Sequence, residues 1–343
     1  MELHPRVLAA VRRAQLASFR DVLCVSGPDL QRLTGLCGSD VQQLLTAAAS
    51  SCRRGGPVPV LLFHRRMETR LGVGCPVLDR LLRGGLPAAL SELAGESGAG
   101  KTQLALQLCL SVQYPTQYGG LDSGAVYICT EDSFPSRRLL QLIRHQPRLR
   151  SDVPPSLINS LQFSDRVYIE HAADLDSLQA CLTRRVPLLL ARGRVRLLVV
   201  DSVAALFRSD FLAADWLART KGLLALSSTL HHLSLEFTTP VLCINQVTDV
   251  FSGSGDSLGP ATSSVTSNVT SDVTPALGLA WANQVTVRLV MRRLQGTIVL
   301  GDQSSALRRL EVVFAPHLPP SGRNAGVWRE GVRGEEGTDG CIR

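Results

Sequence analysis

The chain has 343 residues, of which 45 % are hydrophobic and 19 % charged, a composition that favours a large folded core with a small accessory domain. It has no apolar run long enough for a membrane span, no pattern typical of a signal peptide at its start and no C-x-x-C pair for a zinc cluster. The net charge of +7 permits binding to nucleic acid, although arginines scattered over a solvated surface give the same sum.

Residues 1–50 are predicted to form a small all-helical domain. Apolar residues recur with helical spacing from Val7 to Leu16. A further helix begins at Ser26-Gly27-Pro28-Asp29, which offers a serine cap, an early proline and an acid three residues after the cap, and it ends at Gly35. A last helix is expected to run to about Ala49. We interpret this domain as an interaction module.

Residues 51–70 are predicted to be a linker, because their first part is polar and rich in turn residues. From residue 71 to 320, apolar strand-like runs alternate with helical patterns. Several of these runs are continuously apolar, which is typical of strands covered by helices on both faces. We therefore predict an α/β core with a mostly parallel twisted sheet. The glycine-rich, charged tail 321–343 is expected to be disordered.

Eight strands and five helices are expected in the core. The expected strands are Leu90–Ala94, Ala125–Cys129, Val167–Glu170, Val195–Val200, Val241–Asn245, Val285–Met291, Thr297–Leu300 and Leu310–Phe314. The expected helices are Pro76–Leu82, Lys101–Val112, Arg137–Arg144, Leu175–Ala191 and Asp215–Leu235.

A P-loop follows the first of these strands and opens a helix, which is the context that this motif requires. Its residues are Gly95, Glu96, Ser97, Gly98, Ala99, Gly100, Lys101 and Thr102. The glycines let backbone N–H groups surround phosphates, and the helix N-terminus adds partial positive charge. Lys101 is expected to reach the β- and γ-phosphates, and Thr102 to offer its hydroxyl to Mg²⁺. The motif therefore predicts binding of ATP, or a close relative, with Mg²⁺.

Three further strands end in polar residues. Asp201 ends the run Leu197 to Val200, where a P-loop enzyme places an acidic partner of Mg²⁺, although such an aspartate also caps ordinary turns. Glu131, with Asp132 as the alternative, is the candidate carboxylate for orienting and deprotonating an attacking water. Gln246 ends another strand and either senses the γ-phosphate or simply satisfies a turn.

The P-loop and the three strand ends at Glu131, Asp201 and Gln246, in their order along the chain, resemble those of the RecA-like recombinase family, and of its eukaryotic branch in particular. The resemblance extends from about residue 7 to 320 and includes the small helical domain in front. The segments that carry it are Gly84-Gly85-Leu86, Gly100-Lys101-Thr102-Gln103, Tyr127-Ile128-Cys129-Thr130-Glu131, Val200-Asp201-Ser202 and Asn245-Gln246-Val247.

The resemblance implies a RecA-like P-loop ATPase core with defined roles for single residues. Lys101 and Thr102 would hold phosphate and Mg²⁺, with Lys101 also serving catalysis. Glu131 would be the catalytic carboxylate, Asp201 the further acid of the metal site, and Gln246 the γ-phosphate sensor. Arg138 falls where family members stack a side chain on adenine, a job that suits the guanidinium plane.

The resemblance also implies a biological role in repair of DNA double-strand breaks by homologous recombination. The expected partners are the C-type paralogue of the recombinase in a heterodimer, the recombinase filament, and single-stranded or branched DNA through the complex. No membrane is expected as a partner. The expected location is the nucleus and the cytoplasm, with the mitochondrion as a further compartment.

The sequence departs from the family pattern in segments that family filaments use. The first DNA-binding loop, Asp210–Trp216, has two acids and no base, and the second, Val250–Thr274, has no lysine or arginine. The linker lacks a Phe-x-x-Ala tether after Phe63, and Phe314-Ala315-Pro316 lacks the acid that covers a neighbour's nucleotide. Cations supply most of the affinity for phosphate backbones, so these loops are expected to bind DNA weakly. Together with the missing tether and acid, this predicts a chain that works as the partner subunit of another recombinase paralogue, with weak DNA-dependent ATPase activity.

Two alternatives stay open at this point. The first is a stand-alone DNA-dependent ATPase that forms its own filaments, because the P-loop and Glu131 are intact. The second is a P-loop kinase of a small molecule, although the Ser/Thr-rich loop has no arginine for a phosphate lid.

Overall fold

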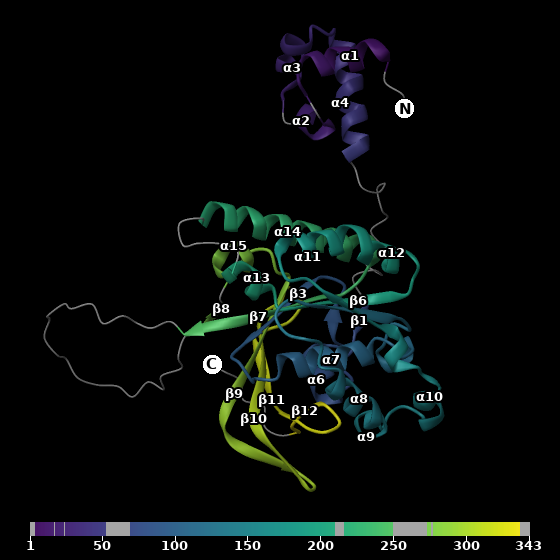
Figure 1. The fold of residues 1–343 in the computed structure, drawn as a ribbon, viewed down its shortest axis with the longest axis vertical. Helices are drawn as coiled ribbons and strands as arrows, with labels where there is room; N and C mark the ends of the chain where they lie inside the picture. Colours follow the sequence, from purple (N-terminus) through teal and green to yellow (C-terminus); the bar gives the residue numbers. More distant parts are fainter. Residues whose placement is uncertain are drawn as a thin grey trace, which may run out of the picture. The chain divides into compact units, whose positions relative to one another are not determined.

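The computed structural model describes residues 4–16, 18–23, 25–52, 69–209, 216–249, 273–275 and 277–336. The chain forms two compact units, residues 1–63 and 64–343 (Figure 1). Among the described residues, no helix combines the length and the apolar character that a membrane crossing needs.

In the first unit, the secondary structure within the described part of residues 4–52 is all helical, as predicted. Its helices are α1 (Pro5–Arg13), α2 (Phe19–Leu23), α3 (Gly27–Thr34) and α4 (Gly38–Cys52). The Ser26 hydroxyl caps α3 by accepting from the Asp29 backbone N–H at 3.3 Å, and Gly35 ends it in the left-handed conformation. A small apolar core, which includes Val7, Leu30 and Leu44, holds the helices together.

The second unit is built on one large sheet, which confirms the predicted α/β core. Its strands are β3 (Leu90–Gly95), β4 (Gly124–Cys129), β5 (Val167–His171), β6 (Val195–Asp201), β7 (Val241–Asp249), β8 (Val273–Pro275), β9 (Val287–Leu300), β10 (Gln303–Phe314), β11 (Ser321–Val327) and β12 (Val332–Gly334). The order is β12-β11-β10-β9-β3-β7-β6-β4-β5, with β8 on β7; β1 (Arg70–Leu71) and β2 (Leu86–Pro87) pair separately. Strands β9, β3, β7, β6, β4 and β5 run parallel.

Helices cover both faces of this sheet (Figure 1). One layer holds α6 (Pro76–Leu81), α7 (Lys101–Ser111), α8 (Ser136–Arg144), α9 (Gln146–Leu149) and α10 (Pro155–Ser160), and the other holds α11 (Leu175–Ala180), α12 (Val186–Ala191), α13 (Val203–Ser209), α14 (Trp216–Phe237) and α15 (Gly278–Ala282). Short turns of helix are η1 (Thr116–Tyr118), η2 (Phe163–Arg166) and η3 (Cys181–Arg185).

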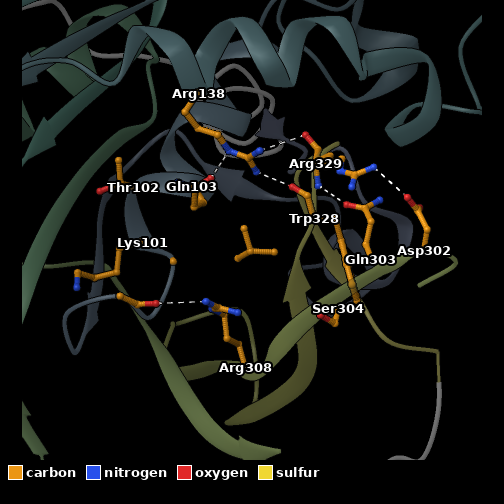
Figure 2. Close-up of a pocket in the computed structure, with 13 residues that line it drawn as sticks. Lys101, Thr102, Gln103, Arg138, Asp302, Gln303, Ser304, Arg308, Trp328 and Arg329 are labelled. Atoms are coloured by element: carbon orange, nitrogen blue, oxygen red, sulfur yellow. Dashed lines mark hydrogen bonds and ion pairs between the residues drawn. The ribbon is translucent and has the colours of Figure 1, made fainter. Parts of the chain in front are cut away.

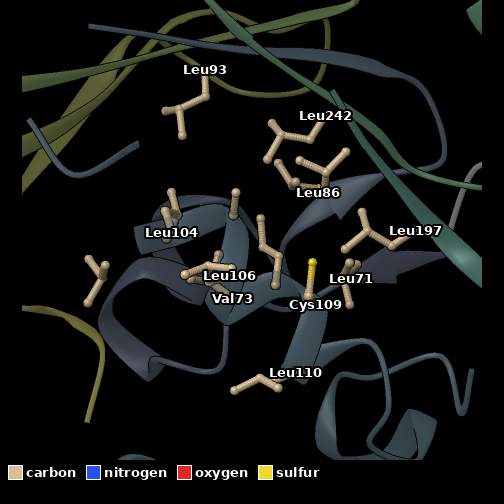
Figure 3. Close-up of a cluster of buried hydrophobic side chains, with 14 of the residues drawn as sticks. Leu71, Val73, Leu86, Leu93, Leu104, Leu106, Cys109, Leu110, Leu197 and Leu242 are labelled. Carbon is tan, nitrogen blue, oxygen red and sulfur yellow. The ribbon is translucent and has the colours of Figure 1, made fainter. Parts of the chain in front are cut away.

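The two layers explain the continuously apolar strands. Because side chains alternate along a strand, Leu197 and Val199 of β6 enter the core under α7, while Leu198 and Val200 enter the core under α13 and α14. Figure 3 shows the first of these cores, in which Leu104 and Leu106 of α7 pack among side chains from the strands. A strand buried on both faces needs apolar residues at every position.

Two expected elements differ in detail. The strands predicted at Val285–Met291 and Thr297–Leu300 are one long strand, β9, because β10 pairs with it across the polar stretch between them. The helix predicted over Leu175–Ala191 contains the π turn η3 between α11 and α12. Pro187 lies in the first turn of α12 and has no N–H to donate to the turn before it.

The prediction of a disordered tail from residue 321 is wrong for residues 321–336. Strand β11 pairs with β10, and β12 pairs with β11. The buried Gln107 of α7 fixes β12, because its amide donates to the Val332 carbonyl at 3.1 Å and accepts from the Val332 N–H at 2.6 Å. The segment has little apolar patterning in the sequence, but Ala325 and Val332 are buried in the main core and add to the backbone pairing and the Gln107 amide. Residues 337–343 lie outside the described part.

Candidate nucleotide-binding site

The P-loop joins β3 to α7 and is shaped by its glycines. Gly98 and Gly100 have φ angles of +72° and +107°. A Cβ atom on Gly100 would lie 3.2 Å from Val327 and 3.3 Å from Met291, so the C-terminal strands press directly on the loop. A glycine at this position therefore serves both the left-handed backbone and the close approach.

Lys101 lies under the loop at the start of α7. Its ammonium group donates to the backbone carbonyls of Gly95 at 2.7 Å and Glu96 at 2.8 Å. Burial lowers the pKa of Lys101, while the negative charges of Asp201, Glu96 and Glu131 act to raise it. The cation is thus held within reach of any phosphate that the loop binds.

Thr102 and Asp201 face each other across the loop. The Thr102 hydroxyl donates to Oδ2 of Asp201 at 2.9 Å, and the Tyr127 hydroxyl of β4 donates to the same oxygen. Burial raises the pKa of Asp201, and the hydrogen bonds from Tyr127 and Thr102 oppose that rise. A hydroxyl and a carboxylate form the hard oxygen donor set that Mg²⁺ prefers, so these residues fit the expected metal.

Tyr127 was missed by sequence reasoning. It lies on β4, which pairs with β6 in parallel so that Cys129 lies opposite Asp201. Its ring is buried against Phe134, and burial together with the Asp201 carboxylate raises its pKa well above the ordinary value. The sequence did contain one indication of this role. Tyr127 stands in a strand of otherwise apolar residues, and a buried phenol needs a hydrogen-bond partner.

Glu131 and Gln246 come together beside the P-loop. Oε2 of Glu131 accepts from the Gln246 amide at 3.0 Å and from the Ser202 hydroxyl at 3.2 Å. Gln246 lies opposite Gly95 in the pairing of β7 with β3, which places it next to the loop. Glu131 and the alternative acid Asp132 are both exposed, so Glu131 is distinguished by its hydrogen bonds to Gln246 and Ser202 and not by burial.

A pocket of about 710 Å³ extends from the P-loop toward the C-terminal strands (Figure 2). Figure 2 shows Lys101 and Thr102 on one side and Gln303, Trp328 and Arg329 on the other. The cations on its lining, Lys101, Arg138, Arg308 and Arg329, outnumber the one acid, Asp302. This balance favours an anionic ligand.

Arg138 of α8 lines this pocket and is fixed by several acceptors in the plane of its guanidinium. Nε donates to Gln103 at 2.6 Å, Nη1 to the Gln141 amide oxygen at 2.5 Å, and Nη2 to the Trp328 carbonyl at 2.6 Å. Such bonds leave the flat faces of the group for stacking. Stacking of Arg138 on adenine stays a prediction.

Arg308 of β10 was also missed by sequence reasoning. It reaches back to the P-loop and donates from Nε to the Ala99 carbonyl at 2.9 Å. Nη1 donates to the Ser305 hydroxyl at 3.1 Å and to the Ala306 carbonyl at 2.8 Å. Nothing in the local sequence indicates this contact, because it joins residues about two hundred positions apart.

A buried carboxylate, also missed, lies behind the P-loop on β3. Glu92 accepts from Asn245 of β7 at 2.7 Å, from the indole of Trp281 of α15 at 2.9 Å and from Arg288 of β9 at 2.5 Å. It is fully buried. Asn245 directly precedes Gln246, so the carboxylate links the strand of the P-loop to the strand of the expected sensor.

Several predicted functional segments lie outside the described residues. These are most of the two expected DNA-binding loops, residues 210–215 and 250–272, and the linker around Phe63 to Arg66.

Comparison with known proteins gives matches over both units. A family model described as Rad51 matches residues 64–333, and a model described as an XRCC3/RpoA-like helix-hairpin-helix domain matches residues 1–52. A Mus musculus protein named DNA repair protein XRCC3 is 50 % identical over 349 residues, with 98 % of each chain covered.

More distant relatives are also similar over most of their length. An Arabidopsis thaliana protein named DNA repair protein XRCC3 homolog is 37 % identical, with 79 % of this chain and 95 % of the relative covered. A Homo sapiens protein named DNA repair protein RAD51 homolog 2 is 29 % identical, with 82 % of this chain and 76 % of the relative covered.

Proposed function

The chain belongs to the Rad51 family, and we propose that it is an ATP-binding subunit that acts in repair of DNA double-strand breaks by homologous recombination. Relatives at 50 % and 37 % identity are named as DNA repair proteins, which supports this role. The observation that carries the nucleotide part is the hydrogen-bonded group of Thr102, Asp201 and Tyr127 beside the P-loop lysine. In this role the chain supports the recombinase filament on single-stranded DNA and the processing of recombination intermediates.

We propose that ATP binds with its phosphates on the P-loop and its base toward Arg138. Lys101 would leave the Gly95 and Glu96 carbonyls to contact the phosphates, since phosphate oxygens are stronger acceptors than carbonyls. Thr102 and Asp201 would hold Mg²⁺, with Tyr127 orienting the carboxylate. Bound Mg²⁺ would neutralise charge on the β- and γ-phosphates. Glu131 would orient the attacking water. Gln246, which contacts Glu131, would hydrogen-bond to the γ-phosphate and so couple its presence to the position of β7.

Replacing Glu131 with glutamine is expected to preserve ATP binding and to slow hydrolysis about 100-fold or more, because the amide cannot take a proton from water. Single-turnover hydrolysis of radiolabelled ATP measures the rate, and equilibrium binding is measured separately. Asp132→Asn is the matched control, since it removes the same charge one residue further along an exposed segment. Slow hydrolysis in Asp132→Asn with normal hydrolysis in Glu131→Gln would reverse the two assignments.

We also propose that the chain works as a heterodimer with the C-type paralogue of the recombinase, and that it meets single-stranded or branched DNA through that complex. The chain is to be purified alone and together with this paralogue. We expect a monodisperse complex that binds single-stranded DNA more tightly than the chain alone. Equal DNA binding by a monodisperse single chain would contradict the subunit role, and filaments of the chain alone in electron micrographs would favour the stand-alone ATPase.

The proposed locations are the nucleus and the cytoplasm, with the mitochondrion as a further compartment. Fractionation of cells followed by immunodetection tests this, and absence of the chain from nuclear fractions after DNA damage would contradict it.

A further inference from the structure

Two turns of the same chain line the side of the pocket opposite the P-loop, and side-chain contacts join them to each other. One is the tip of the β9–β10 hairpin, with Asp302 and Gln303, and the other is the turn after β11, with Trp328 and Arg329. Arg329 forms an ion pair with Asp302 at 3.0 Å, and its backbone N–H donates to Gln303 at 2.8 Å. Figure 2 shows these contacts across the pocket from Lys101.

The base of this pair of turns is firmly held. The Val327 N–H donates to the Ser305 hydroxyl at 3.0 Å, and Gln303 donates to the buried Glu330 carboxylate at 3.1 Å. Gln107 fixes the following strand from the core. Anchors of this kind are buried and therefore costly to break.

The outer latch is weaker. The side chains of Arg329 and Asp302 are 51 % and 73 % exposed, so water and salt compete with their ion pair. An exposed pair of this kind opens and closes at little cost while the buried contacts beneath it persist. The two turns therefore combine a fixed base with an edge that opens.

Arginines join the two turns to the nucleotide-binding elements. Arg138 bridges Gln103 of α7 to the Trp328 carbonyl, and Arg308 bridges β10 to the P-loop carbonyl of Ala99. A nucleotide with its phosphates at Lys101 and its base at Arg138 extends toward these turns, because all of these residues line one pocket.

We propose that residues 302–303 and 328–329 form a cover, supplied by this chain itself, over the base and ribose end of the nucleotide, and that the Asp302–Arg329 latch sets the rate of nucleotide entry and release. This inference rests on the proposed nucleotide-binding function. The cover is made of residues of this chain alone, since Asp302, Gln303, Trp328 and Arg329 all line the pocket that starts at the P-loop.

Charge reversal at each end of the latch tests the cover. The full chain is loaded with a fluorescent ATP analogue, and stopped-flow mixing measures association and dissociation for Asp302→Arg, Arg329→Asp and the double variant with both changes. Each single change replaces attraction with repulsion, so both variants are expected to release the analogue about three- to tenfold faster. The double variant restores an ion pair and the net charge, so its release is expected to return to the parental rate.

The two single changes separate the cover from simple electrostatics. Asp302→Arg adds positive charge and Arg329→Asp removes it, so charge attraction alone would slow release in the first and speed it in the second. Arg192→Asp, on an exposed residue after α12, is the charge-matched control and is expected to release at the parental rate. Thermal unfolding verifies that each variant keeps its fold.

Opposite effects of the two single changes, unchanged rates in both, or no recovery in the double variant would each overturn the cover. A parental chain that binds no ATP analogue, alone or with its partner subunit, would instead overturn the proposed nucleotide function. The two failures are therefore distinguishable.

Discussion

Replacing Lys101 with alanine is expected to weaken ATP binding by at least about 100-fold, since each charge-assisted hydrogen bond to phosphate contributes about 1.5–3 kcal/mol. The ammonium group already lies at the P-loop, where it donates to the Gly95 and Glu96 carbonyls at 2.7 and 2.8 Å, so it has only a short way to move to a bound phosphate. Binding of a labelled ATP analogue, followed by fluorescence anisotropy at fixed Mg²⁺, measures the loss.

The chain offers a matched control for this change. It has one other lysine, Lys221, which is exposed on α14. Lys221→Ala removes the same side chain and charge away from the P-loop, so it is expected to bind ATP like the parental chain. Equal retention of ATP by Lys101→Ala and Lys221→Ala would contradict the assignment of the site.

The Lys101→Arg variant is also expected to bind ATP poorly. The lysine reaches both carbonyls as a compact group, and its exposed fraction is only 8 %. A planar guanidinium is larger and needs acceptors in its own plane. Overpacking beneath the loop would disturb its glycine-rich backbone.

The parts of the site that were predicted from the sequence are those whose functional residues lie close together in the chain or at the end of a recognisable strand. The P-loop is one contiguous segment between a strand and a helix, so its glycines, Lys101 and Thr102 are recognisable together. Glu131, Asp201 and Gln246 each come directly after or near the end of an apolar run, and parallel strands bring the carboxyl ends of these runs to the same edge.

The parts that were missed depend on register between distant strands. Tyr127 reaches Asp201 only because β4 and β6 pair with Cys129 opposite Asp201. Arg308 reaches the P-loop only because β10 and β11 fold back over it. Strands β11 and β12 were missed because their pairing uses backbone groups, which every sequence carries, and because Gln107 of α7 fixes β12 from a distant helix.

Glu92 shows the same dependence on distant partners, and its removal is expected to have the largest effect on stability. Glu92→Ala is expected to destabilise the core by about 3–5 kcal/mol, because it leaves the Arg288 guanidinium without its carboxylate in a buried place. The buried Nη2 atom of Arg288 has no hydrogen-bond partner among the described residues, which indicates that no other acceptor is near enough to replace Glu92. Asn245 and Trp281 lose an acceptor as well. Urea unfolding followed by circular dichroism measures the change in midpoint.

A paired change separates the effect of the buried Arg288 charge from that of the lost hydrogen bonds to Asn245 and Trp281. Glu92→Leu together with Arg288→Leu removes both charges, and replacing a buried ion pair with apolar groups is often neutral in free energy. The double variant is therefore expected to be more stable than Glu92→Ala. Glu236→Ala, at the exposed end of the Glu236–His232 pair on α14, is the control and is expected to leave the midpoint unchanged. A double variant as unstable as Glu92→Ala would mean that the hydrogen bonds to Asn245 and Trp281, and not the buried charge of Arg288, dominate this site.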